Sequence, residues 1–193
     1  MEYPTKEVTA KICLFGDGGV GKTSLIVRYV KGVFDEKYIT TIGTNIYKKI
    51  YWIKQPEFRK AIEFKLMIWD IMGQKGMREL LQDAYFNGCV AAIGVCDITR
   101  KETLDDLDTW RKSIVKVCGE IPIVFLANKC DIVDKAQFKK DDLKAVLKRY
   151  MDELGNSKVR TILAREKDPC IMTSAKTGEG VEKAFQTICE ALA

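Results

Sequence analysis

The stretch Gly16-Asp17-Gly18-Gly19-Val20-Gly21-Lys22-Thr23 is the one from which the fold of this chain can be predicted. It matches G-x-x-x-x-G-K-[S/T], a loop that wraps phosphate groups with its backbone N–H groups. An apolar run before it (10–15) and another after it (25–30) predict a strand and a helix, the setting that this loop requires. We therefore predict a nucleotide site in which Lys22 reaches the β- and γ-phosphates and the Thr23 hydroxyl binds Mg²⁺.

The same glycines allow a second interpretation, a dinucleotide-binding loop. Gly16, Gly18 and Gly21 fit the pattern G-x-G-x-x-G. Asp35 and Glu36 lie near the position of the acid that binds ribose in that motif. That acid should end a second strand, however, and here only two apolar residues precede it, directly after the first helix. The Lys-Thr pair would also have no function in a dinucleotide loop, so the phosphate-loop interpretation is favoured.

The composition predicts a single ordinary globular domain that spans residues 1–193. Apolar residues make up 47% and charged residues 31% of the chain, and the net charge of +5 gives no reason to expect a nucleic-acid partner. We expect neither a membrane span nor a signal peptide. The seven cysteines lack C-x-x-C spacing, which predicts reduced thiols in a cytoplasmic protein. Histidine is absent, so histidine base catalysis is excluded.

Hydrophobic periodicity predicts alternating strands and helices along the rest of the chain. Segments 45–53 and 62–69, joined by a turn at 54–57, predict an antiparallel hairpin with lysines protecting its exposed edge. Further apolar runs predict strands at 90–95, 121–127 and 170–173 and helices at 77–86, 104–117 (with Thr103 as N-cap), 143–154 and 181–192. This order predicts a doubly wound α/β P-loop fold: a six-stranded, mostly parallel sheet with one antiparallel edge strand and helices on both faces.

Polar motifs lie at the ends of the predicted strands or in the loops after them, where ligands gather in such folds. Thr41 lies in the polar loop 33–43, and Asp70, Gly73 and Gln74 follow the third strand. Asn128-Lys129-Cys130-Asp131 and Thr173-Ser174-Ala175-Lys176 follow the fifth and sixth strands. Together with the phosphate loop, these motifs resemble the Ras superfamily of small GTPases over nearly the whole chain. The Tyr38-x-x-Thr41-Ile42-Gly43 stretch and Trp69-Asp70 are most similar to the Rab branch.

The resemblance implies a GTP-binding (G) domain that holds GTP or GDP with Mg²⁺ and hydrolyses GTP to GDP and phosphate. It implies that Thr23, Thr41 and Asp70 hold the metal. It also implies that Gln74 orients the attacking water, with Lys22 and Thr41 completing the catalytic set, and that the Gly73 N–H contacts the γ-phosphate.

Recognition of guanine is expected to depend on Asp131. Its two carboxylate oxygens suit the paired N1–H and N2–H₂ donors of guanine, a pair that adenine lacks. By resemblance, Lys129 lies along one face of the base and Phe34 on the other, the Ala175 N–H reaches O6, and Asn128 ties the base loop to the phosphate loop. The full nucleotide-binding set is Gly18, Gly19, Val20, Gly21, Lys22, Thr23, Ser24, Phe34, Thr41, Gly73, Asn128, Lys129, Asp131, Ser174, Ala175 and Lys176.

Two other classes of function are weighed against a GTPase switch. A guanine-nucleotide-binding module with negligible turnover is opposed by the presence of Gln74 and Thr41. A P-loop ATPase or kinase is opposed by Asp131. The resemblance further implies a monomer in trafficking or signalling, with protein effectors, an exchange factor and a GTPase-activating protein. No cysteine tail follows Ala193, so we expect no membrane anchor in this chain unless a tail is missing from this sequence.

Three features depart from the family pattern. Ile71-Met72 replace the common Thr-Ala before Gly73, Lys75 follows Gln74 where an acid is frequent, and the segment between Asp131 and Ser174 is long. The predicted loop at 32–43 also contains no arginine, and Arg78 is expected to point away from the site. Because an arginine best stabilises the transition state of phosphoryl transfer, we predict slow hydrolysis that a partner accelerates by about 10³–10⁵-fold.

Overall fold

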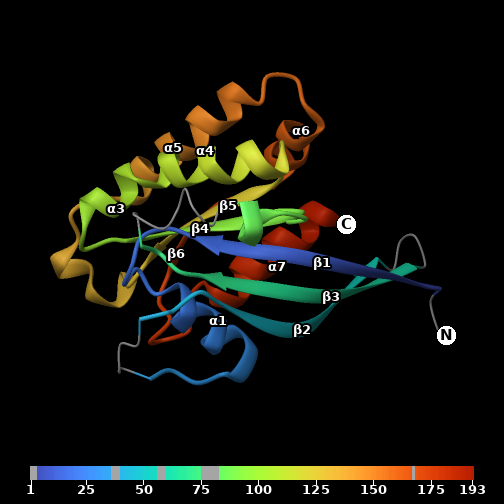
Figure 1. Ribbon diagram of the computed structural model, residues 1–193, viewed down its shortest axis with the longest axis horizontal. Helices are drawn as coiled ribbons and strands as arrows, with labels where there is room; N and C mark the ends of the chain where they lie inside the picture. Colours follow the sequence, from blue (N-terminus) through green and yellow to red (C-terminus); the bar gives the residue numbers. More distant parts are fainter. Residues whose placement is uncertain (1–3, 36–39, 56–59, 75–82, 167) are drawn as a thin grey trace.

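The computed structural model describes residues 4–35, 40–55, 60–74, 83–166 and 168–193. Within them six strands form one sheet in the order β2-β3-β1-β4-β5-β6, and β2–β3 is its one antiparallel pair (Figure 1). The strands are β1 (Thr5–Phe15), β2 (Thr44–Gln55), β3 (Lys60–Ile71), β4 (Ala91–Asp97), β5 (Ile123–Asn128) and β6 (Cys170–Thr173). The helices are α1 (Lys22–Lys31), α3 (Lys101–Asp105), α4 (Leu107–Cys118), the 3₁₀ helix η2 (Cys130–Lys135), α5 (Lys140–Glu153), α6 (Lys158–Arg165) and α7 (Val181–Leu192). The predicted fold class is therefore confirmed.

The strands differ in pattern because they differ in how they are covered. Every residue of β4 and β5 is buried, which explains their continuous apolar runs. β3 alternates instead: Phe64, Leu66 and Ile68 are buried while Lys65 between them is exposed. This alternation is the one predicted from the sequence.

Two layers of helices sandwich the sheet. On one face α1 and α7 pack on β1, β3 and β4, with Leu25, Ile26 and Phe185 among the buried side chains. The other face is covered by α4 and α5, whose Trp110 and Tyr150 belong to a second core. Figure 1 shows α4 and α5 together above the strands, away from α1. Both layers leave the carboxyl ends of the parallel strands open, and the site lies there.

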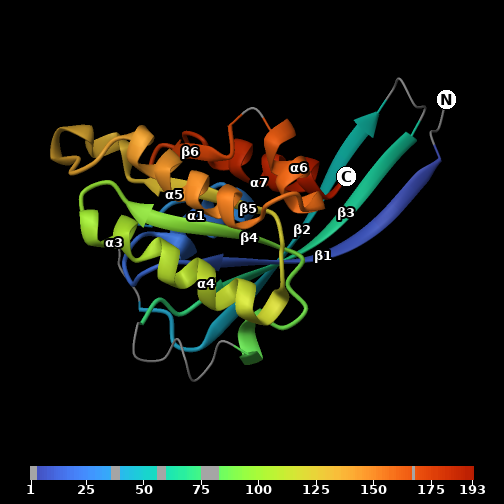
Figure 2. The same cartoon turned by 90° about the horizontal axis from the view of Figure 1, so that it is seen from above.

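Strands β1, β2 and β3 extend beyond the helices, as Figures 1 and 2 show. β2 is the edge strand, and its Lys48 and Lys54 are exposed, as expected of lysines that protect an edge. The predicted turn began too early, because Lys54 and Gln55 continue β2. The rest of that turn lies outside the described residues.

The predicted helix start at Thr103 is wrong. Thr103 lies inside α3, and the residue before that helix is Arg100. The Thr103 hydroxyl donates to the Arg100 carbonyl (2.7 Å) and accepts from the Asp97 N–H (3.0 Å), so it fastens the helix to the end of β4. α3 and α4 are also separate helices, divided at Asp106. The sequence pattern did not reveal this break, because the apolar spacing continues across it.

Two other expectations concern the helix predicted at 77–86 and the long segment between Asp131 and Ser174. Of the predicted helix 77–86, only 83–86 are described, and they are helical. The long segment between Asp131 and Ser174 contains α6, which begins after Ser157; the Ser157 hydroxyl accepts a hydrogen bond from the Arg160 N–H at 3.2 Å.

All seven cysteines are free, as predicted. Among the described helices none is long and apolar enough to cross a membrane.

Candidate functional site

The loop between β1 and α1 has the backbone shape that its glycines permit. Gly16 and Gly21 have φ angles of 131° and 99°, values that side chains rarely allow. A Cβ atom at Gly21 would lie 2.3 Å from Nδ2 of Asn128, and one at Gly16 would lie 2.1 Å from the Val95 carbonyl oxygen. Both glycines are therefore required by crowding as well as by conformation.

Lys22 is a buried cation enclosed by this loop. Its Nζ donates to the carbonyl oxygens of Gly16 and Asp17, both at 2.8 Å. Burial lowers the pKa of Lys22 to about 8, although the nearby carboxylates of Asp70 and Asp17 oppose this shift. A charge held at such a cost favours an anion in the loop, because an anion would restore the solvation that burial removes.

The three residues predicted to hold the metal come together from three separate segments. The Thr23 hydroxyl donates to Oδ2 of Asp70 at 2.6 Å and lies 3.1 Å from the Thr41 hydroxyl. Thr41 in turn lies 3.4 Å from the same Asp70 oxygen. The neighbouring Thr40 is exposed to solvent, so Thr41 is the threonine of this loop that joins the cluster.

The chemistry of this cluster fits Mg²⁺. Asp70 is fully buried, and its Oδ1 has no hydrogen-bond partner among the described residues. Burial raises the pKa of Asp70, against the opposing effects of Thr23 and Lys22. One carboxylate with two hydroxyls is a hard oxygen set, which Mg²⁺ prefers. In the described part of the chain no group of three or more His, Cys, Asp or Glu residues could hold a metal, so the hydroxyls are essential to this candidate.

Asn128 connects three loops at the end of β5. Its Nδ2 donates to the Val20 carbonyl of the phosphate loop at 2.9 Å. Its Oδ1 accepts from the Thr173 hydroxyl (3.2 Å) and from the Ala175 N–H (3.3 Å). The side chain is almost fully buried, so these contacts are shielded from water.

The residues predicted to bind the base flank this connection. Asp131 is exposed, and its Oδ1 accepts from the Ser174 hydroxyl at 2.6 Å. Lys129 has a φ of 69°, the one positive φ outside glycine in the described chain. Phe34 is half-buried and packs on the core that includes α1. The Ala175 N–H, which is expected to reach O6 of guanine, donates here to Asn128.

Gly73 lies against the phosphate loop. A Cβ atom there would lie 2.5 Å from Nζ of Lys22 and 2.6 Å from the Asp17 carbonyl oxygen, so only glycine fits. A Cβ atom at Gly18 would meet only the Gly73 carbonyl oxygen, at 3.7 Å. Gln74 is exposed, whereas the predictions for Lys75 and Arg78 lie outside the described residues.

A single cavity of about 890 Å³ joins the phosphate loop, the metal candidates and the base loop. This volume is in the range of sites that enclose a whole small molecule. Most of the predicted nucleotide-binding residues line it; Val20, Asp70 and Ser174 do not, although all three contact residues that do. The lining residues among those predicted are Gly18, Gly19, Gly21, Lys22, Thr23, Ser24, Phe34, Thr41, Gly73, Gln74, Asn128, Lys129, Asp131, Ala175 and Lys176.

Several residues around the site were not found from the sequence. Trp110 of α4 donates its indole N–H to Oδ1 of Asp17 at 2.8 Å. Arg28 of α1 donates to the carbonyls of Ala175 (2.8 Å) and Lys176, which fixes the loop after β6. Asp97 at the end of β4 was not predicted to belong to the site. Its position at a strand end, beside the other motifs, is the sequence feature that could have identified it.

Comparison with known families agrees with this geometry. The sequence model of the Ras family matches residues 11–193, nearly the entire chain. The matched region begins within β1 and includes every residue of the cavity described above.

Proposed function

Because this chain belongs to the Ras family, we propose that it is a molecular switch that binds GTP with Mg²⁺ and hydrolyses it to GDP and phosphate. The family membership establishes a small GTPase of the guanine-nucleotide-binding kind. That this chain hydrolyses GTP, binds Mg²⁺ and acts with protein partners is what we propose.

The observation that carries the proposal is the convergence of Thr23, Thr41 and Asp70. The loop threonine reaches the phosphate-loop threonine and the strand-end aspartate at 3.1 and 3.4 Å. Mg²⁺ bound there would neutralise charge on the phosphate oxygens. A loop that meets the metal site in this way can respond to whether a γ-phosphate is present.

The remaining steps belong to side chains of this chain. Lys22 supplies positive charge at the phosphates, and the N–H groups of the phosphate loop and of Gly73 donate to their oxygens. Gln74 is placed at the cavity wall and holds the water that attacks in line with the departing GDP. Loss of the γ-phosphate then removes the partner of Thr41 and Gly73, and the two loops change the surface that other proteins recognise.

The finer assignments follow from the sequence motifs. We propose a Rab-like switch in trafficking or signalling, a cytoplasmic monomer of one domain whose effectors, exchange factor and GTPase-activating protein read the two loops. The activating partner supplies the arginine that the loop 32–43 lacks.

The test is a single-turnover assay with GTP and Mg²⁺. Wild-type protein should form GDP slowly, and Gln74→Leu should bind GTP as tightly but hydrolyse it at least about tenfold more slowly, because the water loses its positioning group. Gln186→Leu, an exposed glutamine on α7, is the matched control and should keep the wild-type rate. Binding of GTP without any GDP formation by the wild type would instead identify a guanine-nucleotide module without turnover.

A further inference from the structure

Asp97 is a buried carboxylate that four donors surround. Its Oδ1 accepts from the Thr99 N–H (2.9 Å) and the Thr99 hydroxyl (2.7 Å). Its Oδ2 accepts from Lys129 Nζ at 2.6 Å and from Arg100 Nε at 3.2 Å. Burial alone would raise the pKa of Asp97, but the hydrogen bonds from Lys129 and Thr99 hold it below its usual value. Asp97 therefore stays ionised and can hold two cations.

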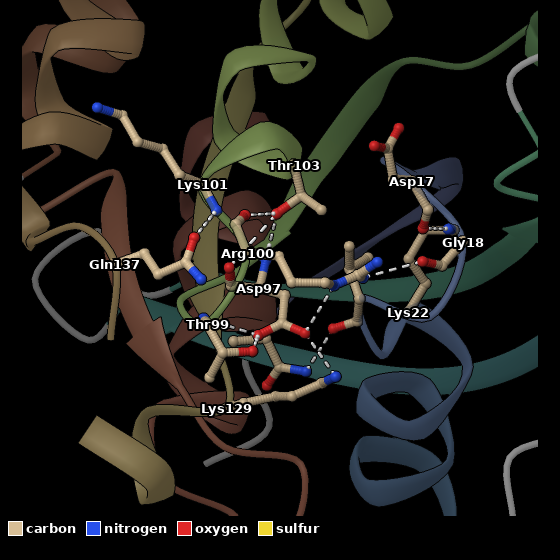
Figure 3. A network of polar contacts seen from close by, with 12 residues as sticks. Asp17, Gly18, Lys22, Asp97, Thr99, Arg100, Lys101, Thr103, Lys129 and Gln137 are labelled. Atoms are coloured by element: carbon tan, nitrogen blue, oxygen red, sulfur yellow. Dashed lines mark hydrogen bonds and ion pairs between the residues drawn. The ribbon is translucent and has the colours of Figure 1, made fainter. Parts of the chain in front are cut away.

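Each cation connects Asp97 to a different wall of the nucleotide cavity. Lys129 lies in the base loop, and its Nζ is held by Asp97. The Arg100 guanidinium reaches the other wall, where Nη2 donates to the Gly18 carbonyl of the phosphate loop at 3.0 Å. Figure 3 shows Lys129, Asp97, Arg100 and Gly18 linked in this order.

This chain of contacts is separate from the one through Asn128. Asn128 joins the base loop to Val20, on the buried side of the phosphate loop. Arg100, whose side chain is 37% exposed, joins the base loop to Gly18, which lies two residues earlier in the phosphate loop. The two walls are thus fastened at two points, by one neutral amide and by one charged bridge.

We propose that Asp97 and Arg100 form a second bridge between the phosphate loop and the base loop, and that this bridge slows the release of bound guanine nucleotide. The inference rests on the proposed function. A nucleotide held by both walls leaves when one wall moves away, and a charge-assisted hydrogen bond between the walls opposes that opening.

Arg100 is a positioning residue in this account. Its guanidinium is occupied by Asp97 and by Gly18, and Arg100 is not among the described residues that line the cavity. Arg100 therefore acts on the nucleotide through the phosphate loop. Asp97 acts through Lys129, whose backbone is held at a φ of 69° at the start of η2.

The experiment measures the release of fluorescently labelled GDP. Wild-type protein is loaded with labelled GDP and Mg²⁺ and then chased with excess GDP. Arg100→Ala should release the label about tenfold faster, the effect of losing one hydrogen bond to a charged group. Arg100→Lys keeps the charge but lacks the planar fork that reaches both Asp97 and Gly18, so its release should also be faster than wild type.

Two comparisons separate positioning from general stability. Lys144→Ala removes an ion pair of the same sequence spacing, with Asp141 three residues away on α5 but exposed to solvent, and should release GDP at the wild-type rate. The melting temperature of the nucleotide-free protein should change no more in Arg100→Ala than in Lys144→Ala. Asp97→Asn should also release GDP faster than wild type. Because Asp97→Asn and Arg100→Ala break the same bridge, the variant with both substitutions should release GDP more slowly than the product of the two single effects predicts.

The outcomes distinguish the two proposals. Wild-type protein that retains no labelled GDP would overturn the proposed function, and this inference with it, before any variant is made. Wild-type protein that retains GDP, together with Arg100→Ala releasing it at the wild-type rate, would overturn only the bridge. A speed-up of equal size in Lys144→Ala would overturn it as well.

Discussion

Among single residues, Lys22 is a charged group whose burial in the site has an electrostatic cost. It is a buried ammonium whose two hydrogen bonds go to neutral loop carbonyls, and burial lowers its pKa to about 8. The folded protein without nucleotide therefore holds this charge less well than the unfolded chain does. Bound phosphate would remove the cost, so part of the affinity for nucleotide would come from restoring the solvation of the Lys22 charge.

The stability of nucleotide-free protein should depend on pH through Lys22. The unfolded chain keeps its lysine proton up to about pH 10.5, whereas the folded state loses it near pH 8, so stability should rise with pH between these values. Lys22→Met should be more stable than wild type at pH 7 by up to about 3 kcal/mol, and this advantage should shrink as the pH rises through the window. Urea unfolding of both proteins at pH 7, 9 and 10.5 measures it. A constant difference across the window would contradict the account.

The residues that the sequence identified share one property: they lie in short motifs at strand ends, where topology alone brings them together. Arg100, Trp110 and Arg28 were missed because their contacts join residues 82, 93 and 147 positions apart, and no local pattern marks either partner. The exposure of Asp131 was also unpredictable from its motif.

Among the elements, the phosphate loop and α4 are connected by a side-chain hydrogen bond. The Trp110 indole N–H donates to the nearly buried carboxylate of Asp17. The apolar spacing that predicted a helix at 104–117 includes Trp110. Trp110 is buried in the core, and it also positions the phosphate loop. Spacing reports which face of a helix is buried and says nothing of what a polar atom on that face contacts.

Trp110→Phe should destabilise the protein by about 1–3 kcal/mol, because the ring is largely kept while Oδ1 of Asp17 loses this donor. Trp52→Phe, at an exposed tryptophan of β2, is the control and should change stability by less than about 0.5 kcal/mol. Denaturant unfolding gives both values. Equal effects in the two variants would show that the indole N–H contributes nothing.

The loop's glycines should differ in what they tolerate. Gly18→Ala should keep GDP affinity within about twofold, because its Cβ would lie 3.7 Å from the nearest atom, an ordinary contact. Gly21→Ala should lose GDP binding, since its Cβ would meet Asn128 at 2.3 Å and its φ of 99° disfavours a side chain. Titration with labelled GDP compares them. Similar affinities in both variants would contradict the loop geometry.

In the whole molecule, the two walls of one cavity lie at the same end of the parallel strands. The six strands, the antiparallel edge strand and the helices on both faces followed from hydrophobic periodicity, since each period specifies an element and each element must bury one face. The order of the strands in the sheet was not predicted. Helix boundaries did not follow as well. Thr103 bonds to the end of β4, a contact that no local pattern marks. Asp106 divides α3 from α4 although the apolar spacing continues across it. The cavity then brings the residues proposed to bind phosphate, metal and base within one ligand's reach.

The most direct test of this central claim is the identity of the nucleotide that copurifies with the protein. Protein purified in Mg²⁺ is denatured, and the released nucleotide is identified and counted by chromatography. The account predicts GDP or GTP at close to one per chain, because the base loop offers a carboxylate to guanine and the phosphate loop offers Lys22 to its phosphates. An adenine nucleotide at that ratio, or no retained nucleotide together with no binding of added GDP, would contradict it.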